Sequence, residues 1–170
     1  MKKILSIDFS TGSKHDEGCG YAFRDETGKI ISGSIKPYSK GSTMHSRTDI
    51  IVDGLEEIIF RYDLQPYDIC IEKPILAGNS GKSIELAQMN GYTLGRLHAL
   101  TQGGVYNIPN SKWCAYHLIK GRRKERKASS VELFKQMTDK TVPDNYKDDN
   151  EADAFNQLLY CEAVDYTEFY

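Results

Sequence analysis

The sequence lacks the features that would set it apart from ordinary globular proteins. No apolar run is long enough to span a membrane, and the short apolar start at Ile4 lacks the length and cleavage site of a secretory signal. There is no internal repeat and no low-complexity tract. We therefore expect a single domain over residues 1–170, large enough to bury a proper core, with no membrane partner.

Close cysteine pairs are also absent. The four cysteines are scattered along the chain, at Cys19, Cys70, Cys114 and Cys161. Because no two of them have the short spacing of a metal-binding motif, a zinc site is disfavoured, and so is a secreted disulfide framework. The simplest location for such a protein is a reducing cytoplasm.

Clustered histidines are missing as well. The four histidines, at His15, His45, His98 and His117, are far apart. We expect each to be a surface residue or a hydrogen-bonded core residue, with His98 packed inside the fold. Neither histidine nor cysteine is therefore expected in a metal site.

Charge is nearly balanced overall, but it is separated along the chain. Residues 120–127 hold six basic residues and one acid, whereas residues 139–170 hold nine acids and two lysines. A basic run can be a solvated loop or helix start, or a segment that contacts phosphates. The acidic end either aids solubility or brings carboxylates toward a site.

Strands dominate the first part of the chain. Strands are predicted over residues 3–9, 18–24 and 29–36, and residues 25–28 form a hairpin turn. The remaining elements follow in this order: a helix over 45–62, a strand over 67–72, a helix over 80–100, a strand over 104–108, a short helix capped by Asn110 or Ser111, a helix over 128–137 and a final helix from about 149. This order predicts an α/β fold: a mixed five-stranded sheet, antiparallel then parallel, with helices on both faces.

Asp8 raises the first functional question, because an apolar strand ends on a charge in "KILSIDFSTGS". It could be a metal ligand, the start of a phosphate-binding loop of the actin-like kinase type, or a strand end before a capped turn. Glu72 ends the fourth strand in the same way, in "ICIEKP". Strand ends can lie side by side in a mixed sheet, and a buried charge there needs something to offset it.

The final helix begins with more acids, in "KDDNEADAF". Asp153 shares a helix face with Asp149, four residues earlier, and with Asn150, three residues earlier. Capping and the helix dipole explain Asp149 better than Asp153, which lies further into the helix. Three or four oxygen ligands without histidine or cysteine suit Mg²⁺ or Mn²⁺, and a pair of such ions can support phosphodiester cleavage.

Several stretches, taken in order, resemble the RuvC family of Holliday junction resolvases, and most closely its small bacteriophage members. They are "SIDFSTGS", "GCGYAF", "ICIEKPILAGNSGKSIELAQMNGYTLGRL", "RKASSVELF" and "NEADAFNQLLY". The resemblance implies an RNase H-like fold, a homodimer, and Mg²⁺-dependent cutting of paired strands at four-way DNA junctions. It implies no organic cofactor, lets Mn²⁺ substitute for Mg²⁺, and places the protein in the cytoplasm of a bacterium or a phage-infected cell.

The resemblance also implies roles for individual residues. Asp8, Glu72 and Asp153 match the catalytic, metal-binding acids of the family. Three residues before the last aspartate the family has another acid or a histidine, whereas this chain has Asn150. An asparagine carbonyl can ligate a hard cation but adds no charge, so Asn150 and the neighbouring Asp149 are both candidate ligands.

The candidate DNA contacts are basic and polar. By resemblance, Lys127 lies near the scissile phosphate, Lys112 is the nearest counterpart of a second such lysine, and Ile75 stands where a family member has an aromatic wedge. The basic loop would clamp the DNA backbone without reading sequence, so that junction shape decides recognition. The full candidate set is Lys14, Asn79, Ser80, Lys82, Lys112, Lys120, Arg122, Arg123, Lys124, Arg126 and Lys127.

A homodimer follows from the resemblance and from geometry, because two symmetric cuts need two active sites that face one junction. The helix over 80–100 carries a small-residue stripe, Ala87, Gly91 and Gly95, which permits close contact with a partner or with the sheet.

Two alternative functions remain open. One is an RNase H-like nuclease with another substrate, such as an RNA–DNA hybrid. The other is a non-catalytic branched-DNA-binding protein whose metal site is incomplete at Asn150.

Overall fold

The computed structural model describes residues 2–15, 17–73 and 81–170, and of Lys82 only the backbone. Its elements in chain order are β1 (Ile4–Phe9), β2 (Cys19–Arg24), β3 (Ile30–Ile35), α1 (Met44–Arg61), β4 (Tyr67–Glu72), α2 (Gly81–Thr101), β5 (Gln102–Ile108), α3 (Asn110–Tyr116), α4 (Arg123–Met137), α5 (Asp149–Ala163) and the short 3-10 helix η1 (Thr167–Phe169). None of the described helices could cross a membrane. All four cysteines are free thiols, in agreement with the expected lack of disulfides.

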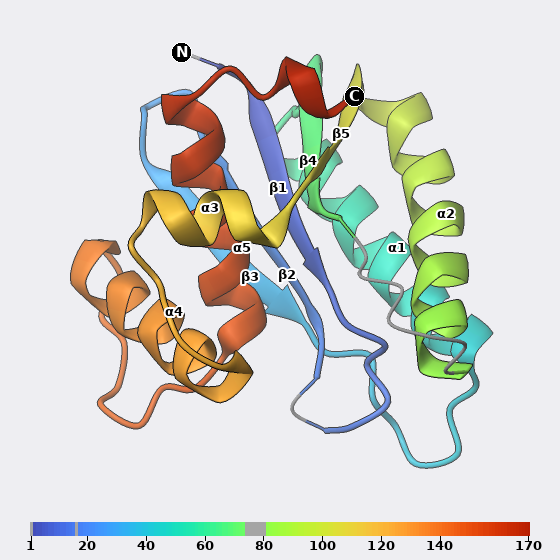
Figure 1. Ribbon diagram of the computed structural model, residues 1–170. Coiled ribbons are helices and arrows are strands. Elements are labelled where there is room, and N and C mark those ends of the chain that lie inside the picture. The colour runs from blue at the N-terminus through green and yellow to red at the C-terminus, as the bar shows by residue number, and fades with distance from the viewer. Residues whose placement is uncertain (1, 16, 74–80) are drawn as a thin grey trace.

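The five strands form one mixed sheet in the order β3-β2-β1-β4-β5 (Figure 1). β1, β2 and β3 are antiparallel neighbours, whereas β4 lies parallel to β1 and β5 parallel to β4. Helices α1 and α2 cover one face, and α3, α4 and α5 lie on the other. The expected α/β architecture, antiparallel then parallel with helices on both faces, is confirmed.

Strand alternation divides the apolar residues into two cores. On β1, Leu5 and Ile7 pack with α1 and α2, whereas Ile4 packs with α5 and its neighbours. The same alternation separates Ile71 of β4, on the α1 side, from Cys70, on the α5 side. Since successive strand side chains point to opposite faces, the even-numbered residues of both strands face α5.

Helix α5 lies unusually close to the sheet, and a glycine makes this possible. A Cβ added to Gly20 of β2 would lie 1.9 Å from the backbone oxygen of Asn150, at the start of α5. Further along α5, the amide of Gln157 donates hydrogen bonds to the Ser6 hydroxyl at 2.9 Å and to the Cys70 carbonyl at 3.0 Å. These contacts fix the position of α5 over β1 and β4.

Buried Arg47 of α1 links three parts of the molecule. Its guanidinium donates to the carbonyl of Thr11, in the loop after β1, at 2.9 Å, and to the carbonyl of Ser42 at 3.0 Å. It also pairs with Glu85 of α2. The loop that follows Asp8 is therefore attached to both helices of the α1–α2 layer.

Three expectations about local structure were wrong. Helix α4 begins at Arg123, so most of the predicted basic loop is helical. Arginine and lysine are good helix formers, and the Glu125 carboxylate accepts from the backbone N–H of Arg122 at 2.6 Å. Helix α3 has Pro109 at its N-cap position, with no side-chain cap, so neither Asn110 nor Ser111 caps it. His98 is exposed rather than packed.

The small-residue stripe of α2 points away from the sheet. Nothing lies within 4 Å of a Cβ built on Gly91 or Gly95. Two large apolar side chains beside the stripe are exposed, Ile84 to 53% and Tyr92 to 49%. Of the two orientations left open by the sequence, the structure has the outward one.

Candidate active site

Asp8 and Glu72 meet at one end of the sheet. Ile7 pairs with Ile71 in the parallel β1–β4 ladder, so the next residue on each strand carries one of the two acids. Both acids stand at even positions and therefore point toward α5. Adjacent strand ends thus bring together two carboxylates that are 64 positions apart in the sequence.

Asp153 comes to the same place from α5. It lies in the second turn of the helix, one turn before Gln157, which is hydrogen-bonded to β1 and β4. Asp8, Glu72 and Asp153 all line one cleft of about 830 Å³. The convergence of these acids, expected from family resemblance, is present in the fold.

Burial raises the pKa of all three carboxyl groups, and repulsion between like charges adds to it at Asp8 and Asp153. Burial raises the pKa of Asp8 well above its usual range, and the charges of Glu72 and Asp153 raise it further. Burial also raises the pKa of Glu72. For Asp153, burial and the Glu72 charge raise the pKa to about 7, against the opposing effects of Ser130, Lys127 and Arg126. The site as folded favours neutralisation of these groups.

Asn150 and Asp149, the two candidate fourth ligands, are both already engaged. In the orientation that satisfies both groups of the Asn150 amide, its nitrogen donates to Asp8 Oδ2 at 3.2 Å and its oxygen accepts from the Gly18 backbone N–H at 3.2 Å. Asp149 forms an ion pair with Lys127. Asn150 therefore contacts a candidate ligand, and Asp149 holds a lysine at the cleft.

Three further polar residues at the site were not foreseen. The Asn110 amide donates to Glu72 Oε2 at 2.7 Å. The Ser130 hydroxyl donates to Asp153 Oδ1, and the Asn156 amide in turn donates to the Ser130 hydroxyl at 2.8 Å. Trp113, which is buried, lies beside Glu72 and lowers its pKa, as Asn110 does.

Sequence signals for two of these residues can be recognised once the fold is known. Ser130 stands four positions before the buried Phe134, so it lies on the inner face of α4, where a polar side chain needs a partner. Asn110 comes two residues after β5 ends, and Ile108 of that strand pairs with Glu72. Neither signal is visible without knowing which strands are neighbours.

Basic side chains form part of the cleft wall. Arg123, Arg126 and Lys127 contribute from α4, Lys14 from the loop after β1, and Lys73 from the end of β4. Arg126 and Lys127 are half-buried, and both lower the pKa values of Glu72 and Asp153. Lys73 was not in the candidate set, although it directly follows Glu72.

The other predicted DNA contacts do not line the cleft. Lys120, Arg122 and Lys124 are exposed around the start of α4, outside it. The Lys112 ammonium lies over the ring of Phe169, 5.9 Å from its centroid. Asn79, Ser80 and Ile75 lie outside the described residues, as does the side chain of Lys82.

The loop after Asp8 is occupied by its own hydrogen bonds. The backbone N–H of Ser10 donates to the Gly18 carbonyl at 3.1 Å, and that of Ser13 donates to a Glu17 carboxylate oxygen at 3.2 Å. A phosphate-binding loop presents free N–H groups to its ligand. This loop instead directs them inward, which disfavours the kinase interpretation of "IDFSTGS".

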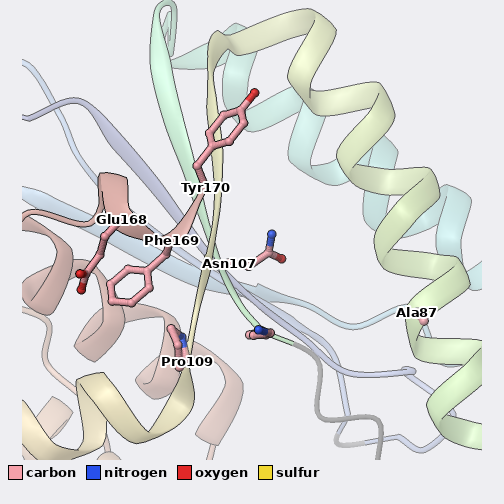
Figure 2. Close-up of a pocket in the computed structure, with 7 residues that line it drawn as sticks. Ala87, Asn107, Pro109, Glu168, Phe169 and Tyr170 are labelled. Carbon is pink, nitrogen blue, oxygen red and sulfur yellow. The ribbon is translucent and has the colours of Figure 1, made fainter.

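A second cavity, of about 510 Å³, lies between α2 and the C-terminal residues (Figure 2). Phe169, Tyr170, Asn107 and Pro109 are among the residues that line it. Among the described residues around this cavity, Glu168 is the only acid. It lacks the converging carboxylates of the cleft, so the cleft is the candidate active site.

The donor set of the cleft fits a hard divalent cation. It consists of oxygen atoms only, which Mg²⁺ and Mn²⁺ prefer, and the clustered like charges need a positive partner. Within the described part of the chain, no three acidic, histidine or cysteine side chains stand close enough together to hold an ion. A divalent cation held by these carboxylates would offset the repulsion between their charges.

Solved structures place the fold in a known class. A Thermus thermophilus RuvC structure is 12% identical, with a TM-score of 0.61 over 94% of this chain and 95% of that chain. T. thermophilus RuvC in complex with a Holliday junction substrate is 14% identical, with a TM-score of 0.56 over 94% of each chain. At such identities the likeness establishes the fold alone. The chain therefore has the RNase H-like fold of these RuvC structures, as expected.

Sequence comparison gives the family. The model described as DUF3882, Lactococcus phage M3 protein, matches residues 1–163, and the chain belongs to this family. The chain is also 34% identical, over 110 residues, to a crossover junction endodeoxyribonuclease RuvC from Psychromonas ingrahamii. That match covers 62% of this chain and 57% of the relative, so the chain spans little more than half the length of that protein. The resemblance to RuvC-type resolvases is confirmed.

Proposed function

We propose that the protein is a structure-selective endonuclease that cuts paired strands at four-way and other branched DNA junctions, with Mg²⁺ or Mn²⁺ as its cofactor. The observation that carries the proposal is the convergence of Asp8, Glu72 and Asp153 beneath a cleft with basic walls. The RuvC relatives supply the substrate class, since one of them is seen with a Holliday junction.

Asp8, Glu72 and Asp153 would hold the divalent ions. When bound, such ions supply positive charge at the attacking and leaving oxygens of phosphodiester hydrolysis. The protein's part is positioning: the acids stand on the ends of two rigid strands and on a helix fixed to the sheet. Asp149 and Asn150 would support the site through Lys127 and Asp8 rather than bind the ions themselves.

Lys127 and Arg126 would face the scissile phosphate. Both are half-buried at the cleft, and Asp149 holds Lys127 in place. A cation fixed at the phosphate stabilises the charge that develops during phosphoryl transfer. Arg123 and Lys14, on the cleft wall, would contact flanking phosphates and contribute salt-dependent affinity without sequence information.

Exposed Lys120, Arg122 and Lys124 would meet DNA beyond the cleft. They stand around the N-terminus of α4, whose later residues reach the cleft, so a DNA arm that leaves the site along α4 passes them. Branched DNA has such diverging arms, whereas a linear duplex does not. This arrangement favours recognition of shape.

The protein would act as a homodimer joined through α2. The stripe of Ala87, Gly91 and Gly95 faces outward and is flanked by exposed Ile84 and Tyr92. Small residues let two helix backbones approach closely, and the apolar neighbours supply buried area. A two-fold dimer would give one junction two clefts related by symmetry.

The test is cleavage of a labelled four-way junction, with a linear duplex, a flap and an RNA–DNA hybrid as comparison substrates. We expect the wild-type protein to cut the junction in Mg²⁺ or Mn²⁺. The variants Asp8→Asn, Glu72→Gln and Asp153→Asn should bind the junction and cut at least 100-fold more slowly, since each removes a proposed ligand. A matched control is Asp144→Asn, which changes an exposed acid outside the cleft.

Each other outcome has a definite meaning. Preference for the hybrid would make the protein an RNase H-like nuclease on another substrate. Tight junction binding without any nicking would make it a branched-DNA-binding protein. Normal cutting by Asp153→Asn would show that α5 does not supply a catalytic acid.

A further inference from the structure

Each of the three acids of the cleft accepts a hydrogen bond from a neutral side chain, and each donor stands on a different helix. Asn110 of α3 donates to Glu72, Ser130 of α4 to Asp153, and Asn150 of α5 to Asp8. The three donors come from separate stretches, yet they repeat one arrangement. Repetition at all three acids argues against an incidental contact.

The donors are themselves held in place. Ser130 is 1% exposed, and its backbone carbonyl and hydroxyl both accept from the amide of Asn156, which is fully buried. Asn150 is buried and tied to the Gly18 backbone through its oxygen. Asn110 follows Pro109 directly, at the first position of α3. A fixed donor restricts the rotation of the carboxylate that it contacts.

The hydrogen bonds also select which oxygen of each acid remains available. They engage Glu72 Oε2, Asp153 Oδ1 and Asp8 Oδ2. Among the described residues, no hydrogen bond engages the other oxygen of Asp8 or of Asp153, whereas Trp113 also lies beside Glu72. One oxygen of Asp8 and one of Asp153 thus stay free to bind a ligand in the cleft.

We propose that Asn110, Ser130 and Asn150 are positioning residues that orient the three acids for divalent cations. The inference rests on the proposed function for the identity of the ligand, but it concerns these neutral donors and not the acids themselves. It gives Asn150 a role in place of the ligand role expected from the sequence: the side chain directs Asp8. Partners of this kind, when lost, typically weaken metal binding about 10- to 100-fold.

The experiment measures Mn²⁺ binding by calorimetry without DNA and the melting temperature in EDTA. Each positioning variant has a matched control that alters a similar, exposed side chain nearby. The pairs are Asn110→Ala with Ser111→Ala, Ser130→Ala with Ser129→Ala, and Asn150→Ala with Asn145→Ala. Ser130→Thr restores a hydroxyl donor and provides a rescue.

We expect each positioning variant to bind Mn²⁺ about 10- to 100-fold more weakly than its control, and Ser130→Thr to recover most of the loss. A merely structural role would lower the melting temperature and leave Mn²⁺ affinity unchanged, and that result would overturn the inference. Ser130→Ala should stay folded, because Asn156 still donates to the backbone carbonyl of residue 130.

Failure of the proposed function can be told apart from failure of this inference. If the wild type binds Mn²⁺ and cuts no junction, the proposed function fails, while the variants still decide the positioning roles. If the wild type cuts junctions and all three variants match their controls in Mn²⁺ affinity, only the positioning roles fail. If the wild type binds no Mn²⁺, both are wrong.

Discussion

The crowded acids make a prediction about stability without metal: the substitution Asp153→Asn should stabilise the protein at alkaline pH. The ordinary pKa of the Asp153 carboxyl is 3.8, and it rises to about 7 in the fold. As the pH increases between these values, the unfolded chain loses its proton first. The contribution of the Asp153 carboxyl to folding stability is therefore greatest at low pH and declines as the pH rises toward 7.

The size of the effect follows from the two pKa values. Their difference corresponds to at most about 4 kcal/mol of folding free energy. The folded protein loses this free energy by the pH at which the folded Asp153 carboxyl is ionised. For a chain of this length, each kcal/mol shifts the melting temperature by about 2–4 °C. The variant should then melt up to roughly 16 °C above the wild type at pH 8 in EDTA, and at the same temperature near pH 4.

The assay is thermal unfolding from pH 4 to pH 8, in EDTA and again in millimolar Mg²⁺. The amide oxygen introduced by Asp153→Asn can still accept from Ser130, so little packing changes. Asp144→Asn, at an exposed site, is the control and should follow the wild type. In Mg²⁺ the wild type should gain more stability than Asp153→Asn, because a cation offsets the repulsion that the variant has already reduced.

A single result would refute this reasoning. If Asp153→Asn melts no higher than the wild type at pH 8 in EDTA, while the control behaves as expected, then burial and the Glu72 charge do not raise the pKa of Asp153 in the folded protein. The electrostatic account of the cleft would then be wrong.

Two further predictions concern glycines. Gly20→Ala should destabilise the protein by about 3 kcal/mol, because its Cβ would lie 1.9 Å from the Asn150 backbone oxygen. Chemical unfolding measures this loss. The control is Gly81→Ala, whose Cβ meets no atom within 4 Å and which should leave the free energy of unfolding unchanged. Gly91→Glu, on the outward stripe of α2, should turn a dimer into a monomer by light scattering without loss of fold, since nothing lies within 4 Å of its Cβ. The control Thr141→Glu adds the same charge elsewhere on the surface and should remain dimeric. If light scattering gives the same molecular mass for both variants, α2 is not the dimer interface.

Features that depend on local pattern could be predicted from the sequence. The fourth strand begins at Tyr67 and ends at Glu72 as expected, because an apolar alternation is bounded there by a turn and a proline. The carboxylates at 8, 72 and 153 were identified through ordered motifs, and the fold brings them together. Parallel neighbours align their strand ends, which explains Asp8 and Glu72, whereas Asp153 on α5 was indicated by the family resemblance.

Features that depend on tertiary packing could not be predicted. The Ser130–Asp153 hydrogen bond joins two helices whose relative placement is set by Phe134 and Phe155, with ring centroids 5.0 Å apart. No sequence spacing encodes that contact. The same holds for His98, whose helix could have turned either face to the sheet.

Arg47 has a consequence for the geometry of cutting. Through this one side chain, the loop that leaves Asp8 is fastened to Glu85 on the helix proposed as the subunit boundary. In a dimer built on that helix, each cleft would be held at a fixed position relative to the two-fold axis, and the two clefts could not move independently. The spacing between the two nicks would then be a fixed dimension of the protein, to which a pliable junction must adjust.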